Sequence, residues 1–141
     1  EETVDPWGFV YTSKRGLHLP SGRVISYPSL HEEPRERGKG KEFWYGQGRH
    51  RARIYAGKVT ENIVQALARD IIAENALEFT RRTGVHPSLL VHDEIVAVVP
   101  EVEADDMLAE LQGIMRTPPK WWPEIVVWSE GDKGDRYSDA K

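Results

Sequence analysis

The sequence predicts an α+β fold in which a mostly antiparallel sheet carries one long helix and a second helix packed on it. Short apolar runs separated by turn residues occupy positions 7–27 and 88–99, as expected for strands. Apolar residues recur at helical spacing in residues 60–84 and 102–115. The elements follow in the order strands, helix, hairpin, helix, strand, which is typical of an α+β domain. With 141 residues and 39% hydrophobic composition, the chain is long enough for one modest core.

Charge is distributed unevenly along the chain. The net charge is -4, yet Lys14–Lys58 holds eleven lysines and arginines against four acidic residues. Such a basic block indicates a face that meets phosphates, and a solvated charged loop is the alternative. No apolar run approaches the ~20 residues of a membrane helix, and the first residues do not resemble a signal peptide. We therefore expect a cytoplasmic protein without a membrane partner.

The first strands are predicted around a turn. The runs Leu17–Leu19 and Val24–Tyr27 flank Pro20-Ser21-Gly22-Arg23, whose composition favours a tight reversal. We expect these two runs to pair as a hairpin.

The following segment is polar and basic. Residues Pro28–Lys41 are rich in Pro, Glu, Arg, Lys and Gly, which predicts a surface loop, and the whole basic loop extends over about 29–50. Glu42–Tyr45 and Arg53–Tyr55 then predict a second short hairpin.

The long helix is the strongest element of the pattern. Thr60 is expected as its N-cap with Glu61 in the first turn, and Gly84 as its stop. Its apolar stripe consists of Ile63, Val64, Leu67, Ala68, Ile71, Ile72 and Phe79.

The C-terminal half predicts a second hairpin and a second helix. Ser88–Val91 and Ile95–Val99 are apolar, branched runs separated by His92-Asp93-Glu94, so the hairpin has a charged tip. Val102–Met115 has the spacing of an amphipathic helix, and Ile125–Trp128 is expected to be a last strand.

Two groups of polar residues are candidates for chemistry. Asp93, held at a strand end, suits half of a magnesium site, because this ion takes one or two carboxylates plus water and substrate phosphates. The alternative is that Asp93 and Glu94 are ordinary turn residues. The long helix also has one stripe of polar side chains, namely Lys58, Asn62, Gln65 and Arg69. Lys and Arg can bind phosphates, and Asn and Gln can donate hydrogen bonds to minor-groove acceptors. The alternative is an ordinary solvated helix face.

Four segments together resemble the C-terminus of family A DNA polymerases, and the bacteriophage members most closely. In order they are LHLPSGRVISYP, YAGKVTENIVQALARDII, LLVHDEIVAVVP and SEGDKGDRYSDAK. The resemblance covers the chain from Trp7 onward except the basic loop from Ser29 to Arg49. It implies that residues 1–141 are the C-terminal part of the polymerase palm subdomain.

The resemblance also implies roles for single residues. Asp93 matches the motif C aspartate that binds the catalytic magnesium pair, Glu94 its acidic neighbour, and His92 the histidine at the primer terminus. Gln65 matches the helix residue that touches the minor groove, whereas Glu61 stands where the family usually has Asn, with Asn62 one residue later. The expected DNA-binding set is His92, Gln65, Asn62, Lys58, Arg69 and Arg23.

The implied reaction is nucleotidyl transfer, in which a primer 3′-hydroxyl attacks a deoxynucleoside triphosphate and two magnesium ions stabilise the attacking and leaving oxygens. The sequence contains no segment like motif A or the fingers helix, so the chain contributes only part of the two-metal site. We expect it to be inactive alone, as a fragment or as one subunit of a split enzyme. Its expected partners are primer-template DNA, deoxynucleoside triphosphates, and polymerase segments or a partner chain that carry the missing parts. A non-catalytic DNA-binding module, a metal-dependent nuclease using Asp93 and Glu94, and a purely structural interaction domain are the alternatives.

Overall fold

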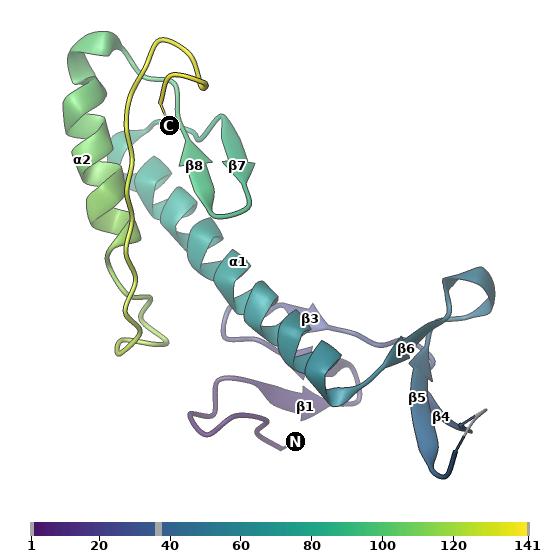
Figure 1. Cartoon of the computed structure of the whole chain (residues 1–141). Coiled ribbons are helices and arrows are strands. Elements are labelled where there is room, and N and C mark those ends of the chain that lie inside the picture. Colours follow the sequence, from purple (N-terminus) through teal and green to yellow (C-terminus); the bar gives the residue numbers. More distant parts are fainter. Residues whose placement is uncertain (1, 36–37, 141) are drawn as a thin grey trace. The chain divides into compact units, whose positions relative to one another are not determined.

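A computed structural model describes residues 2–35 and 38–140 (Figure 1). It confirms the α+β class, with antiparallel sheets and two α-helices in the described residues. The strands are divided among three small sheets rather than joined in one larger sheet. The chain forms two compact units, Glu1–Leu67 and Ala68–Lys141, which are described separately below.

The first sheet of the first unit has the strand order β1-β2-β3 and is antiparallel throughout. It consists of β1 (Tyr11–Ser13), β2 (Gly16–His18) and β3 (Val24–Ile25). Leu17 pairs with Ile25 and His18 with Val24, which confirms the hairpin predicted around the Pro20–Arg23 turn.

The second sheet contains β4 (His31–Pro34), β5 (Lys41–Tyr45) and β6 (Ala52–Ile54), with a 3-10 turn, η1 (Gly48–His50), before β6. The β5–β6 pairing confirms the second predicted hairpin. The prediction that 28–41 is entirely loop is wrong, because β4 pairs with β5. Opposite charges stabilise this polar strand, as Lys41 pairs with Glu32 at 2.5 Å. Positions 36 and 37 of the predicted loop lie outside the described residues.

The core of the first unit lies between the β1–β3 sheet and the first part of α1 (Ala56–Thr83). Its most buried side chains are Val10, Leu17 and Leu19. The partly buried residues packed against them include Val59, Ile63, Ala66 and Leu67 of α1. Of the apolar stripe predicted for the helix, Ile63 and Leu67 face this core, whereas Val64 is 59% exposed.

The start of α1 differs from the prediction. The helix begins at Ala56, and Thr60 lies inside it, where its hydroxyl donates to the Ala56 carbonyl at 3.1 Å. Thr60 is therefore not the N-cap. The predicted stop is confirmed: Gly84 has a φ of 75°, and its N–H donates to the Thr80 carbonyl at 2.8 Å. A left-handed backbone of this kind favours glycine.

The second unit contains the end of α1, a two-stranded sheet, a short 3-10 turn and a second helix (Figure 1). These elements are β7 (Leu89–Val91), β8 (Glu94–Val96), η2 (Glu101–Glu103) and α2 (Ala104–Met115). The predicted hairpin and second helix are confirmed, with a 3-10 start to the latter. The prediction of a strand at Ile125–Trp128 is wrong, since this segment is extended chain without a paired strand in the described part of the molecule.

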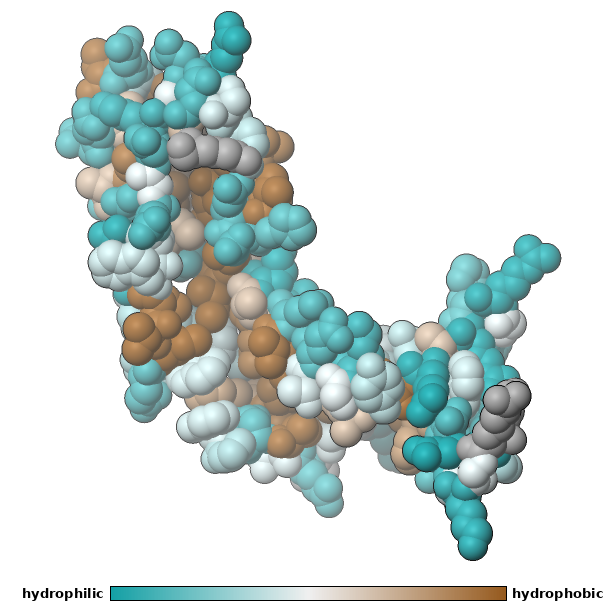
Figure 2. Space-filling model, viewed as in Figure 1, coloured by the Kyte–Doolittle hydropathy of each residue, from teal (hydrophilic) through white to brown (hydrophobic). Residues whose placement is uncertain are grey.

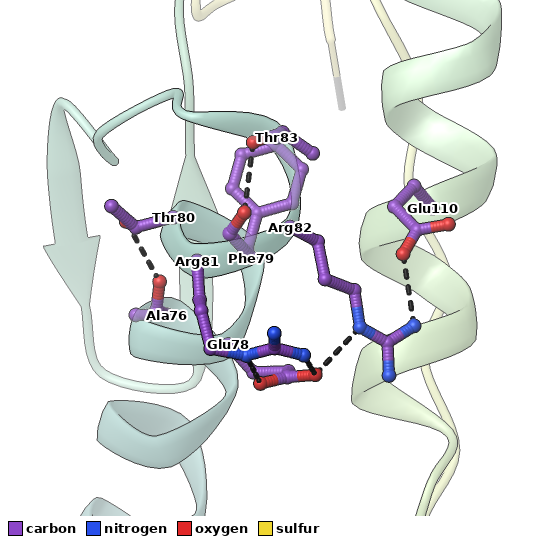
Figure 3. A network of polar contacts seen from close by, with 8 residues as sticks. All are labelled: Ala76, Glu78, Phe79, Thr80, Arg81, Arg82, Thr83 and Glu110. Atoms are coloured by element: carbon purple, nitrogen blue, oxygen red, sulfur yellow. Dashed lines mark hydrogen bonds and ion pairs between the residues drawn. The ribbon is translucent and has the colours of Figure 1, made fainter.

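Packing and charge hold the end of α1 to α2. Phe79 and Ile114 are 1% and 3% exposed. On the surface, Arg82 joins Glu78 of its own helix to Glu110 of α2, at 2.6 and 2.9 Å (Figure 3). Arg81 also hydrogen-bonds Glu78, and together the two arginines lower the pKa of this carboxyl to about 2.

Apolar side chains also remain on the surface, as Figure 2 shows for one face. Those of the second unit include three consecutive residues of β7, namely Leu89, Leu90 and Val91, which are 49%, 37% and 37% exposed. In the described residues, no helix has the length and apolar character needed to cross a membrane.

Candidate functional site

The hairpin of the second unit places Asp93 at a tight turn. Val91 pairs with Glu94, so His92 and Asp93 form a two-residue connection between β7 and β8. His92 has a φ of 52°, a left-handed conformation that side chains rarely adopt. Such strained residues occur where the surrounding structure fixes them, often at functional sites. The turn therefore sets the direction of the neighbouring Asp93.

The two carboxylates at this turn differ in their contacts. Asp93 is exposed, and within residues 2–35 and 38–140 its carboxylate makes no hydrogen bond or ion pair. Glu94 is also exposed but accepts a hydrogen bond from the Tyr137 hydroxyl of the C-terminal tail. This hydrogen bond raises the pKa of Tyr137 above its ordinary value, because ionising the phenol would break it beside a negative charge. Asp93 is thus the carboxylate available to a ligand.

A pocket of about 350 Å³ lies next to this turn, within the second unit. Asp93 and Glu94 are part of its wall. The rest of the wall mixes apolar and polar side chains and comprises Ile71, Ile72, Asn75, Met115, Val127, Trp128, Ser129 and Glu130.

The wall formed by the C-terminal segment is fixed by Arg116 at the end of α2. Its Nε and Nη2 donate to the Ser129 carbonyl at 3.1 and 2.7 Å. The guanidinium carbon also lies 4.3 Å from the centre of the Trp128 ring, a cation–π contact. Ser129 is 6% exposed, and its hydroxyl donates to the Gln112 carbonyl at 3.4 Å. The shape of the pocket therefore depends on Arg116.

The polar residues predicted on α1 have different surroundings. Asn62 is half-buried, and its amide donates to the Tyr27 hydroxyl at 2.9 Å. Lys58 pairs with Glu61 at 3.0 Å, and this hydrogen bond raises the pKa of the lysine. Gln65 is exposed and donates to Glu61 at 3.3 Å. Glu61 therefore restrains both Lys58 and Gln65.

The two remaining basic candidates also differ. Arg23 donates through Nη2 to the Ala66 carbonyl of α1 at 2.8 Å, which ties the β1–β3 sheet to the helix. Arg69 is exposed. The structure brings His92, Asp93 and Glu94 together at one turn of the second unit. Arg23, Lys58, Asn62 and Gln65 belong to the first unit.

Sequence reasoning did not identify several residues of the candidate site. Asn75 and Ser129 line the pocket and are buried, and Tyr137 contacts Glu94 from a distant position in the chain. Neither spacing nor motif could have indicated Tyr137, since its contact depends on the path of the C-terminal tail. Asn75 could have been predicted more easily, because a polar residue among apolar helix positions indicates a buried polar group.

Comparison with known proteins shows a similarity to a phage protein. The chain is 34% identical over 127 residues to the DNA polymerase of Bacillus phage SP02, and the match covers 86% of the chain. The chain is related to a phage DNA polymerase. It spans 19% of the length of that polymerase. No protein-family model matches the chain, and no solved structure matches it.

The predicted relationship to a phage DNA polymerase is thus confirmed for a chain that corresponds to a minor part of such a protein. Its membership of family A, its position in the palm and its metal site stay predictions.

Proposed function

We propose that this chain supplies the motif C part of the palm of a family A DNA-directed DNA polymerase. The observation that carries the proposal is the free Asp93 carboxylate at a strained turn, in a chain related to a phage DNA polymerase over most of its length. The reaction is transfer of a deoxynucleotide to a primer 3′-hydroxyl. The remainder of the catalytic site, including motif A and the fingers, comes from polypeptide outside this sequence.

Asp93 fits a magnesium half-site. Magnesium takes only one or two protein carboxylates and keeps water and substrate phosphates as its other ligands. In the described part of the chain, no three His, Cys, Asp or Glu side chains are grouped so that they would hold a metal ion. Asp93 would therefore share the ion with a second aspartate from another segment. Once bound, two such ions would stabilise the attacking and leaving oxygens of the transfer.

The other site residues would bind and orient DNA. Glu94, held by Tyr137, would keep a negative charge beside Asp93, and His92 would contact the primer terminus. On α1, Gln65 would reach the minor groove, where an amide finds acceptors common to all base pairs. Lys58, Arg69 and Arg23 would lie near phosphates, whereas Asn62 would position Tyr27 through the hydrogen bond they share.

The exposed apolar surface of β7 supports the proposal that this chain assembles with further polypeptide. Leu89, Leu90 and Val91 are exposed on β7, which among the described residues pairs with β8 on one edge and with no strand on the other. A contiguous apolar strand at an open edge favours association with other polypeptide. The partner we propose is the part of the polymerase that carries motif A.

Replacing Asp93 by Asn tests the proposal in the chain combined with the remaining polymerase polypeptide. Metal-ion stabilisation contributes several kcal/mol, so we expect nucleotide incorporation to fall by about a thousandfold while primer-template affinity is retained. Asp106→Asn is the matched control, because it removes the same charge from an exposed position on α2. Incorporation by Asp93→Asn equal to that of the control would refute the catalytic role. Magnesium-dependent cleavage of DNA by the isolated chain would instead identify a nuclease.

A further inference from the structure

The segment that contains the β4–β6 sheet has a net positive charge. Residues 29–55 contain seven lysines and arginines against four acidic residues, although the whole chain has a net charge of -4. The positive surplus of this segment complements a polyanion. The catalytic role proposed for Asp93 does not use it.

The strand register divides the side chains of this sheet between two faces. On one face, Trp44 lies directly between its cross-strand partners His31 and Arg53. Arg51 is on the same face as Arg53, because alternate residues of a strand point the same way. The opposite face carries Ile54, which is 5% exposed, and also Phe43, which is 46% exposed, so both faces of the sheet reach solvent. We call the face that carries His31, Trp44 and Arg53 the outer face.

An arginine is stacked on the tryptophan of this outer face. The Arg51 guanidinium carbon lies 4.2 Å from the centre of the Trp44 ring. Arg51 also pairs with Glu33 through Nη2, and its side chain remains 37% exposed. The ion pair with Glu33 restrains the edge of the Arg51 guanidinium, and the Trp44 ring covers one of its two faces. The part of the Arg51 side chain that stays exposed is accessible to a further flat group.

The neighbouring arginines leave a positive surplus. Arg53 and Arg35 share one carboxylate, Glu42, at 3.4 and 3.7 Å. The side chains of Arg53 and Arg35 are 49% and 47% exposed, whereas that of Glu42 is 17% exposed. One carboxylate cannot neutralise two cations, so this pair can accept an anion from solvent.

We propose that the outer face of the β4–β6 sheet binds single-stranded DNA, with a base stacked on Arg51 and backbone phosphates on Arg53 and Arg35. A planar guanidinium supported by an aromatic ring offers a surface to any base, and exposed arginines beside it offer charge to the backbone. An unpaired strand suits this flat face, because its bases are free to turn toward protein. The surface is distinct from the hairpin turn that carries Asp93.

Binding of a fluorescein-labelled oligothymidylate of ~12 nucleotides to the full chain, followed by anisotropy, tests this surface. Arg51→Lys keeps the charge but removes the planar group, and we expect at least about fivefold weaker binding from the lost stacking. Arg53→Ala should lower the slope of log affinity against log salt by about one. Lys41→Ala is the matched control, since it removes one cation from the opposite face and should change affinity less than Arg53→Ala does.

Two further probes identify the occupant. An abasic phosphodiester of the same length should bind more weakly than oligothymidylate, and equal affinity would overturn the stacking role of Arg51. Tighter binding of oligouridylate than of oligothymidylate would overturn DNA as the occupant. Equal losses in Lys41→Ala and Arg53→Ala would overturn the assignment to the outer face, provided circular dichroism shows that each variant is folded. Because the Asp93→Asn test measures nucleotide incorporation, the two proposals can fail separately.

Discussion

Replacing Arg116 by Ala is expected to release the segment Val127–Glu130 from α2 and open the pocket beside Asp93. The substitution leaves the Ser129 carbonyl without its two donors, in a residue only 6% exposed. An unsatisfied buried acceptor costs ~1–3 kcal/mol, and an exposed cation–π contact adds ~0.5–1 kcal/mol. Because Arg116 itself is exposed, we take the lower half of this range, about 2 kcal/mol. The open population of the segment should then rise roughly thirtyfold.

Cleavage by a glutamate-specific protease measures this opening, because Glu130 directly follows Ser129. When opening is fast relative to cleavage, the cleavage rate tracks the open population, so cleavage after Glu130 should accelerate by about the same factor. Arg116→Lys, which keeps the charge but not the two-pronged donor, should give an intermediate rate. Arg82→Ala is the control, since it removes an exposed arginine that contacts Glu110 instead. Equal cleavage after Glu130 in Arg116→Ala and Arg82→Ala would refute the reasoning.

Three other outcomes are expected. Phe79→Ala should lower the free energy of unfolding by ~3–5 kcal/mol in urea denaturation, because its side chain is 1% exposed, whereas Leu77→Ala, 71% exposed, should change it little. The pKa of Glu78 is lowered to about 2, so its ion pairs stabilise the fold fully above pH 4.5 and are lost as the pH falls through about 2. Thermal melts should therefore show a larger acid destabilisation in the wild type than in Glu78→Gln, and parallel losses would contradict this. Because the pKa of Tyr137 is raised, its hydrogen bond to Glu94 is complete below pH 10 and is lost as the pH rises through the raised pKa. Glu94→Gln should therefore lower the pKa of Tyr137 in an ultraviolet titration. An unchanged pKa would exclude this hydrogen bond.

The sequence predicted the structure best where one hydrophobic periodicity extends over many residues. The body of α1 and its end at Gly84 follow from the apolar stripe and the glycine. The start of the helix is harder to predict, because Thr60 has the composition of an N-cap and Gly57 disfavours helix on propensity alone. Packing of Val59 and Ile63 against the β1–β3 sheet outweighs that local preference.

Two strands show why short segments were predicted less well. β4 has no apolar alternation, and its pairing rests on cross-strand charges that lie far apart in sequence. Ile125–Trp128 has strand-forming residues, but Arg116 at the end of α2 donates hydrogen bonds to the carbonyl of the following residue, Ser129, and holds the segment along α2. Asp93 was recognisable because two apolar runs flank it. Its neighbourhood, with Tyr137 and Ser129, depends on tertiary contacts that no local pattern encodes.

The glutamates of the β4–β6 sheet compete with any incoming phosphate for the same guanidinium groups. Glu33 already occupies Arg51, and Glu42 occupies both Arg35 and Arg53. Exposed pairs of this kind contribute only ~0–1 kcal/mol each, so a polyanion can displace the carboxylates at small cost, but an isolated phosphate gains little over them. The sheet should therefore discriminate by chain length, ignoring mononucleotides and responding only to strands long enough to engage several arginines at once.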